Sequence, residues 1–82
     1  MSRAYAKFFR KEKRMELVGL KKARKKKAIS QLKVAMDLSI TREALSHYEN
    51  GKRSPDVDML VKLARYFGVS VDYIIFGEDS QS

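Results

Sequence analysis

The residues best suited to chemistry in this sequence stand on one side of a short segment near its middle. When residues 41–50 are placed at about 100° per position, as in a helix, Ala44, Leu45 and Tyr48 fall on one face. The other face carries hydrogen-bonding side chains of different lengths: Arg42, Glu43, Ser46, His47 and Asn50. Such a row suits the edges of DNA bases, because the major groove admits a helix. An ordinary solvated helix face has the same pattern, so the surrounding sequence must separate the two interpretations.

Catalysis would need titratable groups that converge on one point, and the sequence offers few. Asp37, Glu43 and His47 are the only candidates near one another, and a lone histidine on an exposed helix usually has no chemical role. The 82 residues contain no cysteine and one histidine, which argues against disulfides, thiolate metal sites and histidine-rich metal sites. A chain this short also cannot enclose a deep substrate cavity. We therefore expect a protein that is not an enzyme and that uses no metal or other cofactor.

Positive charge is concentrated at the beginning of the chain. The formal net charge is +8, and residues 1–27 contain twelve of the eighteen lysines and arginines but only two acidic residues, Glu12 and Glu16. This block favours a polyanionic partner, which charge alone leaves open between nucleic acid, an anionic membrane and an acidic protein. A solvated helix face is the alternative. No apolar run reaches the roughly 18 residues of a membrane span, and the first twenty residues do not resemble a secretory signal. We therefore expect a soluble, cytoplasmic protein with no membrane partner.

Apolar residues recur at helical spacing through residues 17–77 and nowhere alternate for long, so the sequence predicts an all-α domain. Five helices are expected, the first from about residue 16 to 26. The others should begin at residues whose side chains can cap the first free amides: Ser30, Thr41, Asp56 and Ser70. The positions expected to face the core outside residues 41–50 are Leu17, Leu20, Ala23, Ile29, Val34, Ala35, Leu38, Val57, Leu60, Val61, Ala64, Phe67, Val71, Ile74 and Ile75.

Three short motifs resemble a single family. Ser30-Gln31 stands at the start of the second helix, Y-E-N-G-K-x-x-P covers residues 48–55, and L-A-x-x-x-G-V-S covers residues 63–70. Together, in this order and at this spacing, they resemble the phage-repressor and Cro type of helix-turn-helix domain, the XRE family of transcriptional regulators. The resemblance implies a compact five-helix, lambda-repressor-like DNA-binding domain over about residues 17–77. It further implies that the second helix lies against the DNA backbone and the third lies in the major groove.

The resemblance also assigns individual residues. Its base-reading positions correspond to Arg42, Glu43, Ser46 and His47, and its backbone-contacting positions correspond to Gln31, Thr41, Asn50, Lys52 and Arg53. Arg42 is the strongest candidate, because a bidentate arginine on guanine is the commonest specific contact. Glu43 would be repelled by phosphate, so it either accepts a hydrogen bond from cytosine or holds Arg42 in place. His47 either reaches a base or serves as a spacer.

Two further contacts follow from the same resemblance. Arg24 and Glu49 match positions that form a buried ion pair. A homodimer is expected on double-stranded DNA with a palindromic or pseudo-palindromic operator, and its interface should contain Ile74, Ile75 and Phe76 at the apolar end of the last helix. The expected function is repression by promoter occlusion, in a bacterium, a phage or another mobile element. The alternative is a protein-interaction or dimerisation module of the same fold, which would not lose affinity steeply with salt.

Two features depart from the family pattern. Ser39 occupies the turn position that usually holds glycine, and it would carry some strain if its backbone is left-handed. Residues 1–16 form a basic extension before the domain, and residues 78–82 are expected to be a disordered tail. The helically spaced residues of the extension are Ala4, Tyr5, Phe8, Phe9 and Glu12. The extension is an added helix packed on the domain, a basic arm along the DNA backbone, a membrane-surface amphipath or an untemplated tail, and Met15 is an alternative start.

Overall fold

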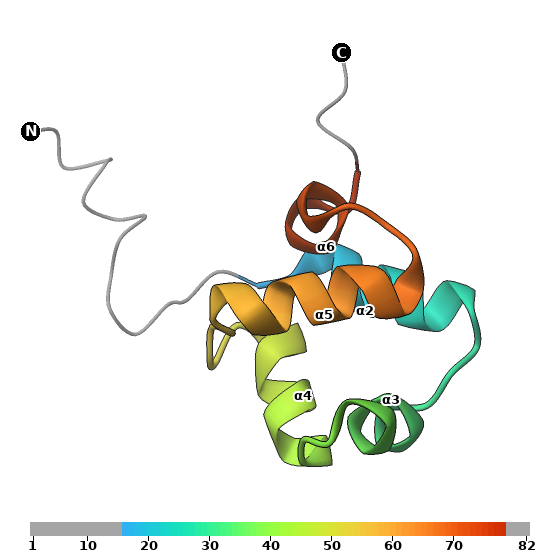
Figure 1. The fold of residues 1–82 in the computed structure, drawn as a ribbon, viewed down its shortest axis with the longest axis vertical. Coiled ribbons are helices and arrows are strands. Elements are labelled where there is room, and N and C mark those ends of the chain that lie inside the picture. The colour runs from blue at the N-terminus through green and yellow to red at the C-terminus, as the bar shows by residue number, and fades with distance from the viewer. Residues whose placement is uncertain (1–15, 79–82) are drawn as a thin grey trace, which may run out of the picture.

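The computed structural model describes residues 16–78, and within this range it contains five α-helices and no strand. In chain order the helices are α2 (Val18–Lys26), α3 (Gln31–Leu38), α4 (Arg42–Asn50), α5 (Val57–Phe67) and α6 (Val71–Phe76) (Figure 1). The predicted all-α domain of five helices is confirmed. None of the described helices is long and apolar enough to cross a membrane. The expectations for the basic extension and the C-terminal tail fall on residues 1–15 and 79–82, outside the described residues.

Four helices begin at the predicted capping residues. In each case the side chain of the capping residue accepts a hydrogen bond from the backbone N–H three residues later, which satisfies one of the free amides of the first turn. These bonds join Lys33 to Ser30 (3.1 Å), Ala44 to Thr41 (2.9 Å), Met59 to Asp56 (2.9 Å) and Tyr73 to Ser70 (2.9 Å). The N-cap of α2 is Leu17, whose side chain offers no acceptor, and this helix begins two residues later than predicted, at Val18.

α5 crosses the middle of the molecule (Figure 1) and packs against α6 and α2. α6 packs against α2 and α5, and α2 also touches α4. α3 packs against α4, and this pair lies at the end of the molecule away from α6 (Figure 1). α2, α5 and α6 therefore pack together as one group, and the α3–α4 pair is attached to this group through the contact between α2 and α4.

Each described helix contributes to one apolar core. Its buried members are Leu17, Leu20, Ala23, Val34, Ala35, Leu45, Tyr48, Leu63, Ala64, Phe67 and Ile74. The prediction for Val57 is wrong, since its side chain is 72% exposed, and Leu63 is buried in its place. The buried stripe of α5 runs through Leu63 and Phe67, which leaves Val57 on the edge of the stripe and in the first turn of the helix. Helical periodicity alone therefore predicts a buried stripe that is rotated too far toward Val57.

α2 and α6 approach each other closely at Gly19. A Cβ atom built on this glycine would lie 1.5 Å from the carbonyl oxygen of Tyr73, so no other residue fits without moving a backbone. The close approach directs Ile74 into the core, where it is fully buried. Of the three residues predicted for a dimer interface, Ile74 is therefore inaccessible in this domain, whereas Ile75 is half-buried and Phe76 is exposed.

Two residues other than glycine adopt the left-handed backbone conformation. Ser39, between α3 and α4, has φ 60° and ψ 41°, which is the conformation anticipated for this turn. Ala28, between α2 and α3, has φ 57°, and nothing in the sequence predicted it. A side chain in this region costs about 1 kcal/mol or more, because its Cβ crowds the backbone. Both ends of α3 are thus set by strained connections.

Candidate nucleic-acid interface

α4 directs its polar row away from the core. Leu45 and Tyr48 are buried, and they fix the rotation of the helix about its axis. On the other side Arg42, Glu43 and Asn50 are exposed, and Ser46 and His47 are half-buried. The helix therefore presents donors and acceptors of several lengths along one outer face, as direct readout of base edges requires.

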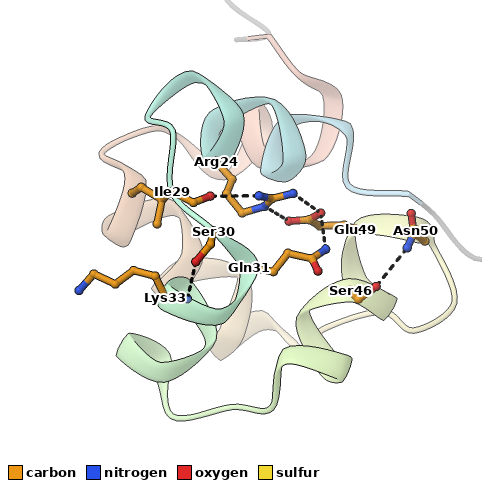
Figure 2. A network of polar contacts seen from close by, with 8 residues as sticks. All are labelled: Arg24, Ile29, Ser30, Gln31, Lys33, Ser46, Glu49 and Asn50. Carbon is orange, nitrogen blue, oxygen red and sulfur yellow. Dashed lines mark hydrogen bonds and ion pairs between the residues drawn. The ribbon is translucent and has the colours of Figure 1, made fainter.

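Two of these polar side chains contact each other. The Asn50 amide nitrogen donates a hydrogen bond to the Ser46 hydroxyl at 3.3 Å, one helical turn away (Figure 2). Thr41, at the other end of the helix, is exposed, and its oxygen accepts the capping hydrogen bond from the Ala44 amide. In this structure the side chains of Thr41, Ser46 and Asn50 thus support the helix as well as facing outward.

The loop after α4 carries two cations. Gly51 has φ 77°, and this left-handed residue turns the chain back across the end of α4. The backbone amides of Lys52 and Arg53 both donate to the carbonyl oxygen of His47, at 2.9 and 3.3 Å. The Arg53 guanidinium also lies 5.8 Å from the centre of the Tyr48 ring. The exposed positive charge of the loop is therefore attached to the helix that bears the polar row.

Residues predicted from separate segments meet between α3 and α4. Gln31, the first residue of α3, and Arg42, the first residue of α4, both line two shallow hollows on the surface. One hollow also contains Arg24, Ser30 and Leu32, and the other contains Glu43 and Ser46. A candidate backbone contact and a candidate base contact thus lie beside each other on one continuous surface.

A partly buried ionic network borders this surface (Figure 2). The structure brings Arg24 and Glu49 together, with Arg24 Nε 2.6 Å from Glu49 Oε2 and Nη2 3.1 Å from Oε1. Arg24 Nη1 donates to the carbonyl oxygen of Ile29 at 3.0 Å. Gln31 Nε2 donates to Glu49 Oε1 at 3.1 Å. The network therefore joins α2, α3 and α4, and the hydrogen bond from Gln31 to Glu49 was not predicted, because the sequence analysis had assigned Gln31 only to the DNA backbone.

A second polar contact holds the other end of α3. The Tyr66 hydroxyl of α5 donates to Asp37 Oδ2 at 2.6 Å, and Lys33 Nζ lies 3.1 Å from the same oxygen. The hydrogen bond from Tyr66 and then the one from Lys33 lower the pKa of Asp37. Conversely, the hydrogen bond to the Asp37 carboxylate raises the pKa of Tyr66. Sequence reasoning missed this contact, because Asp37 and Tyr66 lie 29 positions apart and the motifs that carried the family resemblance do not pair them.

Within residues 16–78 no three side chains of histidine, aspartate or glutamate gather closely enough to hold a metal ion. Asp37, one of the three candidates for acid–base chemistry, is bound by Tyr66 and Lys33. What the arrangement offers chemically is a hydrogen-bonding surface with adjacent cations.

Comparison with known families agrees with this geometry. The family model for helix-turn-helix domains matches residues 20–74, which extend from α2 into α6 and include the whole α3–α4 unit. The chain belongs to the XRE-type helix-turn-helix family. The sequence resemblance to this family is thereby confirmed, and α3, the Ser39 turn and α4 are its helix-turn-helix.

Three relatives from Bacillus subtilis (strain 168) are similar over most of this chain. The uncharacterized HTH-type transcriptional regulator YqaE is 42% identical over 62 residues, which cover 76% of this chain and 53% of YqaE. The SPbeta prophage-derived uncharacterized HTH-type transcriptional regulator YonR is 44% identical over 62 residues, covering 76% of this chain and 57% of YonR. The HTH-type transcriptional regulator ImmR is 43% identical over 63 residues, covering 77% and 49%. The chain thus spans about half the length of these relatives.

Proposed function

We propose that this chain is a sequence-specific, double-stranded DNA-binding transcriptional regulator that represses by occluding a promoter. α4 lies in the major groove and α3 lies against the sugar-phosphate backbone. The observation that carries the proposal is the outward polar row of α4, held in place by buried Leu45 and Tyr48 and flanked by Gln31. Family membership and the names of the relatives support it. Occlusion is the simplest mechanism, because it requires no surface beyond the one that binds DNA.

The surface divides into residues that read bases and residues that hold the backbone. The base-reading residues are Arg42, Glu43, Ser46 and His47, and the backbone residues are Gln31, Thr41, Asn50, Lys52 and Arg53. Arg42 is exposed in the first turn of α4, where a bidentate contact with guanine is accessible. Lys52 and Arg53 carry the charges that displace counterions from phosphates.

The regulator binds as a homodimer through the end of α6. Phe76 is 61% exposed and Val18 is 52% exposed. A Cβ atom at Gly77 would lie 3.1 Å from Val18 Cγ1, which places Val18 beside the end of α6. We assign the two-fold contact to Val18, Ile75 and Phe76, which are apolar residues on or beside the end of α6. The operator is then a palindrome or pseudo-palindrome, with recognition helices about 34 Å apart. We assign the protein to the cytoplasm, where such an operator is found.

Selection of bound sequences from a random pool of double-stranded DNA tests the function. We expect enrichment of one motif with two-fold symmetry and a steep loss of affinity with salt. A pool that stays random after selection would overturn sequence-specific recognition. Affinity for a protein partner that is insensitive to salt, without DNA binding, would instead favour an interaction module.

Two substitutions then distinguish residues that contact bases from residues that contact the DNA backbone. Arg42→Ala should cost roughly 1–3 kcal/mol on the selected site, relax the preference at one base position, and change binding to scrambled DNA little. Lys52→Ala should weaken binding to all sequences alike and reduce the logarithmic salt slope by about one. Arg65→Ala and Lys62→Ala are matched controls, since both residues are exposed on α5 and lie outside the proposed surface.

The pattern of losses decides between the roles. If Arg42→Ala lowers both affinities equally, its contribution is electrostatic and the assigned reading face is wrong. If neither substitution matters while deletion of residues 1–14 abolishes binding, the basic extension is the real contact with DNA.

A further inference from the structure

A buried carboxylate lies directly behind the surface proposed to meet a polyanion. Only 1% of the Glu49 side chain is exposed, yet Glu49 contacts Gln31, the first residue of α3 (Figure 2). A negative charge in this position would repel a DNA phosphate, so its presence needs a physical reason.

Arg24 both fixes and neutralises this carboxylate. Its Nε and Nη2 atoms bind the two oxygens of Glu49 at 2.6 and 3.1 Å, and its Nη1 atom is held by the carbonyl oxygen of Ile29. A fork of this kind sets the plane of the carboxylate as well as its distance. The third hydrogen bond to Glu49, from Gln31, is therefore made to an acceptor that cannot easily move.

The geometry of the amide group then determines where Gln31 points. Its nitrogen carries two hydrogens in the plane of the amide, and one of them is directed at Glu49 Oε1. With that hydrogen bond made, the direction of the second N–H is fixed by the planar amide. A glutamine without this bond would have to order several side-chain torsions when it binds DNA.

We propose that Glu49 is a positioning residue for DNA binding, which holds the Gln31 amide so that its second N–H donates to a DNA phosphate. Arg24 makes this possible, because its charge offsets that of Glu49. This inference rests on the proposed function, since it assumes that Gln31 meets the DNA backbone.

The test is a comparison of Gln31→Ala in two backgrounds. One background is the natural sequence, and the other is Arg24→Met/Glu49→Leu, which removes both charges together with the acceptor for the Gln31 amide. In the natural background Gln31→Ala should weaken binding to the selected site about tenfold. In the neutral background, where Gln31 is no longer held, the loss should fall to about twofold. Lys52→Ala is the matched control, and its effect should be the same factor in both backgrounds.

A purely structural role of Glu49 would not produce this coupling. Affinities are measured well below the melting temperature and corrected for the folded fraction from circular dichroism. If Glu49 had only a structural role, its replacement would lower DNA affinity by the same factor whether or not Gln31 is present. Gln31→Ala would then weaken DNA binding equally in the two backgrounds, and that result would overturn the inference.

Nuclear magnetic resonance of the natural chain gives a second test that does not depend on the folding of any variant. The Gln31 side-chain amide proton that is bound to Glu49 should exchange with water more slowly than the side-chain amide protons of free, blocked glutamine in the same buffer. Equal, fast exchange would overturn the inference. Failure of the natural chain to select any DNA refutes the proposed function itself. Normal effects of Arg42→Ala and Lys52→Ala without coupling to Gln31 refute only the positioning role.

Discussion

Removing Arg24 while keeping Glu49 tests the contact between α2 and α4 most directly. Arg24→Met keeps much of the apolar stem and loses the charge, so Glu49 is left with the hydrogen bond from Gln31. Breaking a buried ion pair in this way costs about 3–5 kcal/mol, because an uncompensated charge stays in a dry site. The Glu49 side chain is 1% exposed and that of Arg24 is 13% exposed, so some water reaches the arginine side. We therefore expect the lower end of the range, about 3 kcal/mol.

A loss of about 3 kcal/mol is a large share of the free energy of unfolding of a domain this small. A domain of about 60 residues has a free energy of unfolding of roughly 3–9 kcal/mol. A loss of about 3 kcal/mol should lower the melting temperature by roughly 12–24 °C in a domain of this size. Urea denaturation and thermal unfolding, both followed by far-ultraviolet circular dichroism, measure the two quantities independently.

Two control variants identify the cause. Arg24→Met/Glu49→Leu removes both charges and should recover most of the lost stability, since well-packed apolar residues often replace a buried ion pair at little cost. Arg24→Lys keeps the positive charge but loses the two parallel hydrogen bonds of the guanidinium. Its free energy of unfolding should therefore lie between those of Arg24→Met and the natural chain. A loss below about 1 kcal/mol for Arg24→Met, or a double variant no more stable than the single one, would refute the assignment of a buried, mutually dependent pair.

Other parts of the fold give further predictions. Gly19→Ala should lower the free energy of unfolding by about 3 kcal/mol or more in urea denaturation, because its Cβ would lie 1.5 Å from the Tyr73 carbonyl oxygen. Ser39→Gly should raise it by about 0.5–1 kcal/mol by relieving the left-handed backbone, and a decrease would contradict that strain. The pKa of Asp37 is lowered and that of Tyr66 is raised by their hydrogen bond. The bond thus stabilises the fold between these values, and its contribution is lost as pH falls through the folded-state pKa of Asp37 or rises through that of Tyr66. Melting temperatures measured from acidic to alkaline pH should show that the losses of stability at low and at high pH are both smaller in Tyr66→Phe than in the natural chain. The same pH dependence in both proteins would contradict the contact.

The helix boundaries were accessible from the sequence because their causes are local. Ser30 and Asp56 each cap the amide three residues later, so the residues that start a helix lie beside one another in the chain. The two faces of α4 were predictable for the same reason, since Leu45 and Tyr48 are separated by three positions on one helix. The family motifs then assigned functions to the residues on the outer face of α4. Helical periodicity alone cannot distinguish that face from an ordinary solvent-exposed helix face.

What the sequence did not reveal depends on how helices are placed relative to one another. Val57 has the correct spacing for the core, but its burial depends on which neighbours reach the first turn of α5. The hydrogen bond from Tyr66 to Asp37 spans 29 positions, and the one from Gln31 to Glu49 spans 18. Neither pair follows from helical periodicity, because each depends on the distance and rotation between two packed helices.

These long-range contacts converge on α3, which buries only two of its side chains fully. Val34 and Ala35 are its buried residues, and they fix its distance from the core more firmly than its direction. The bonds of Gln31 at one end and of Asp37 at the other fix that direction, because they attach the two ends to different helices. If α3 lies on the DNA backbone, its direction sets the angle at which α4 enters the groove. Tyr66, which lies outside the proposed DNA surface, should therefore influence DNA affinity through α3.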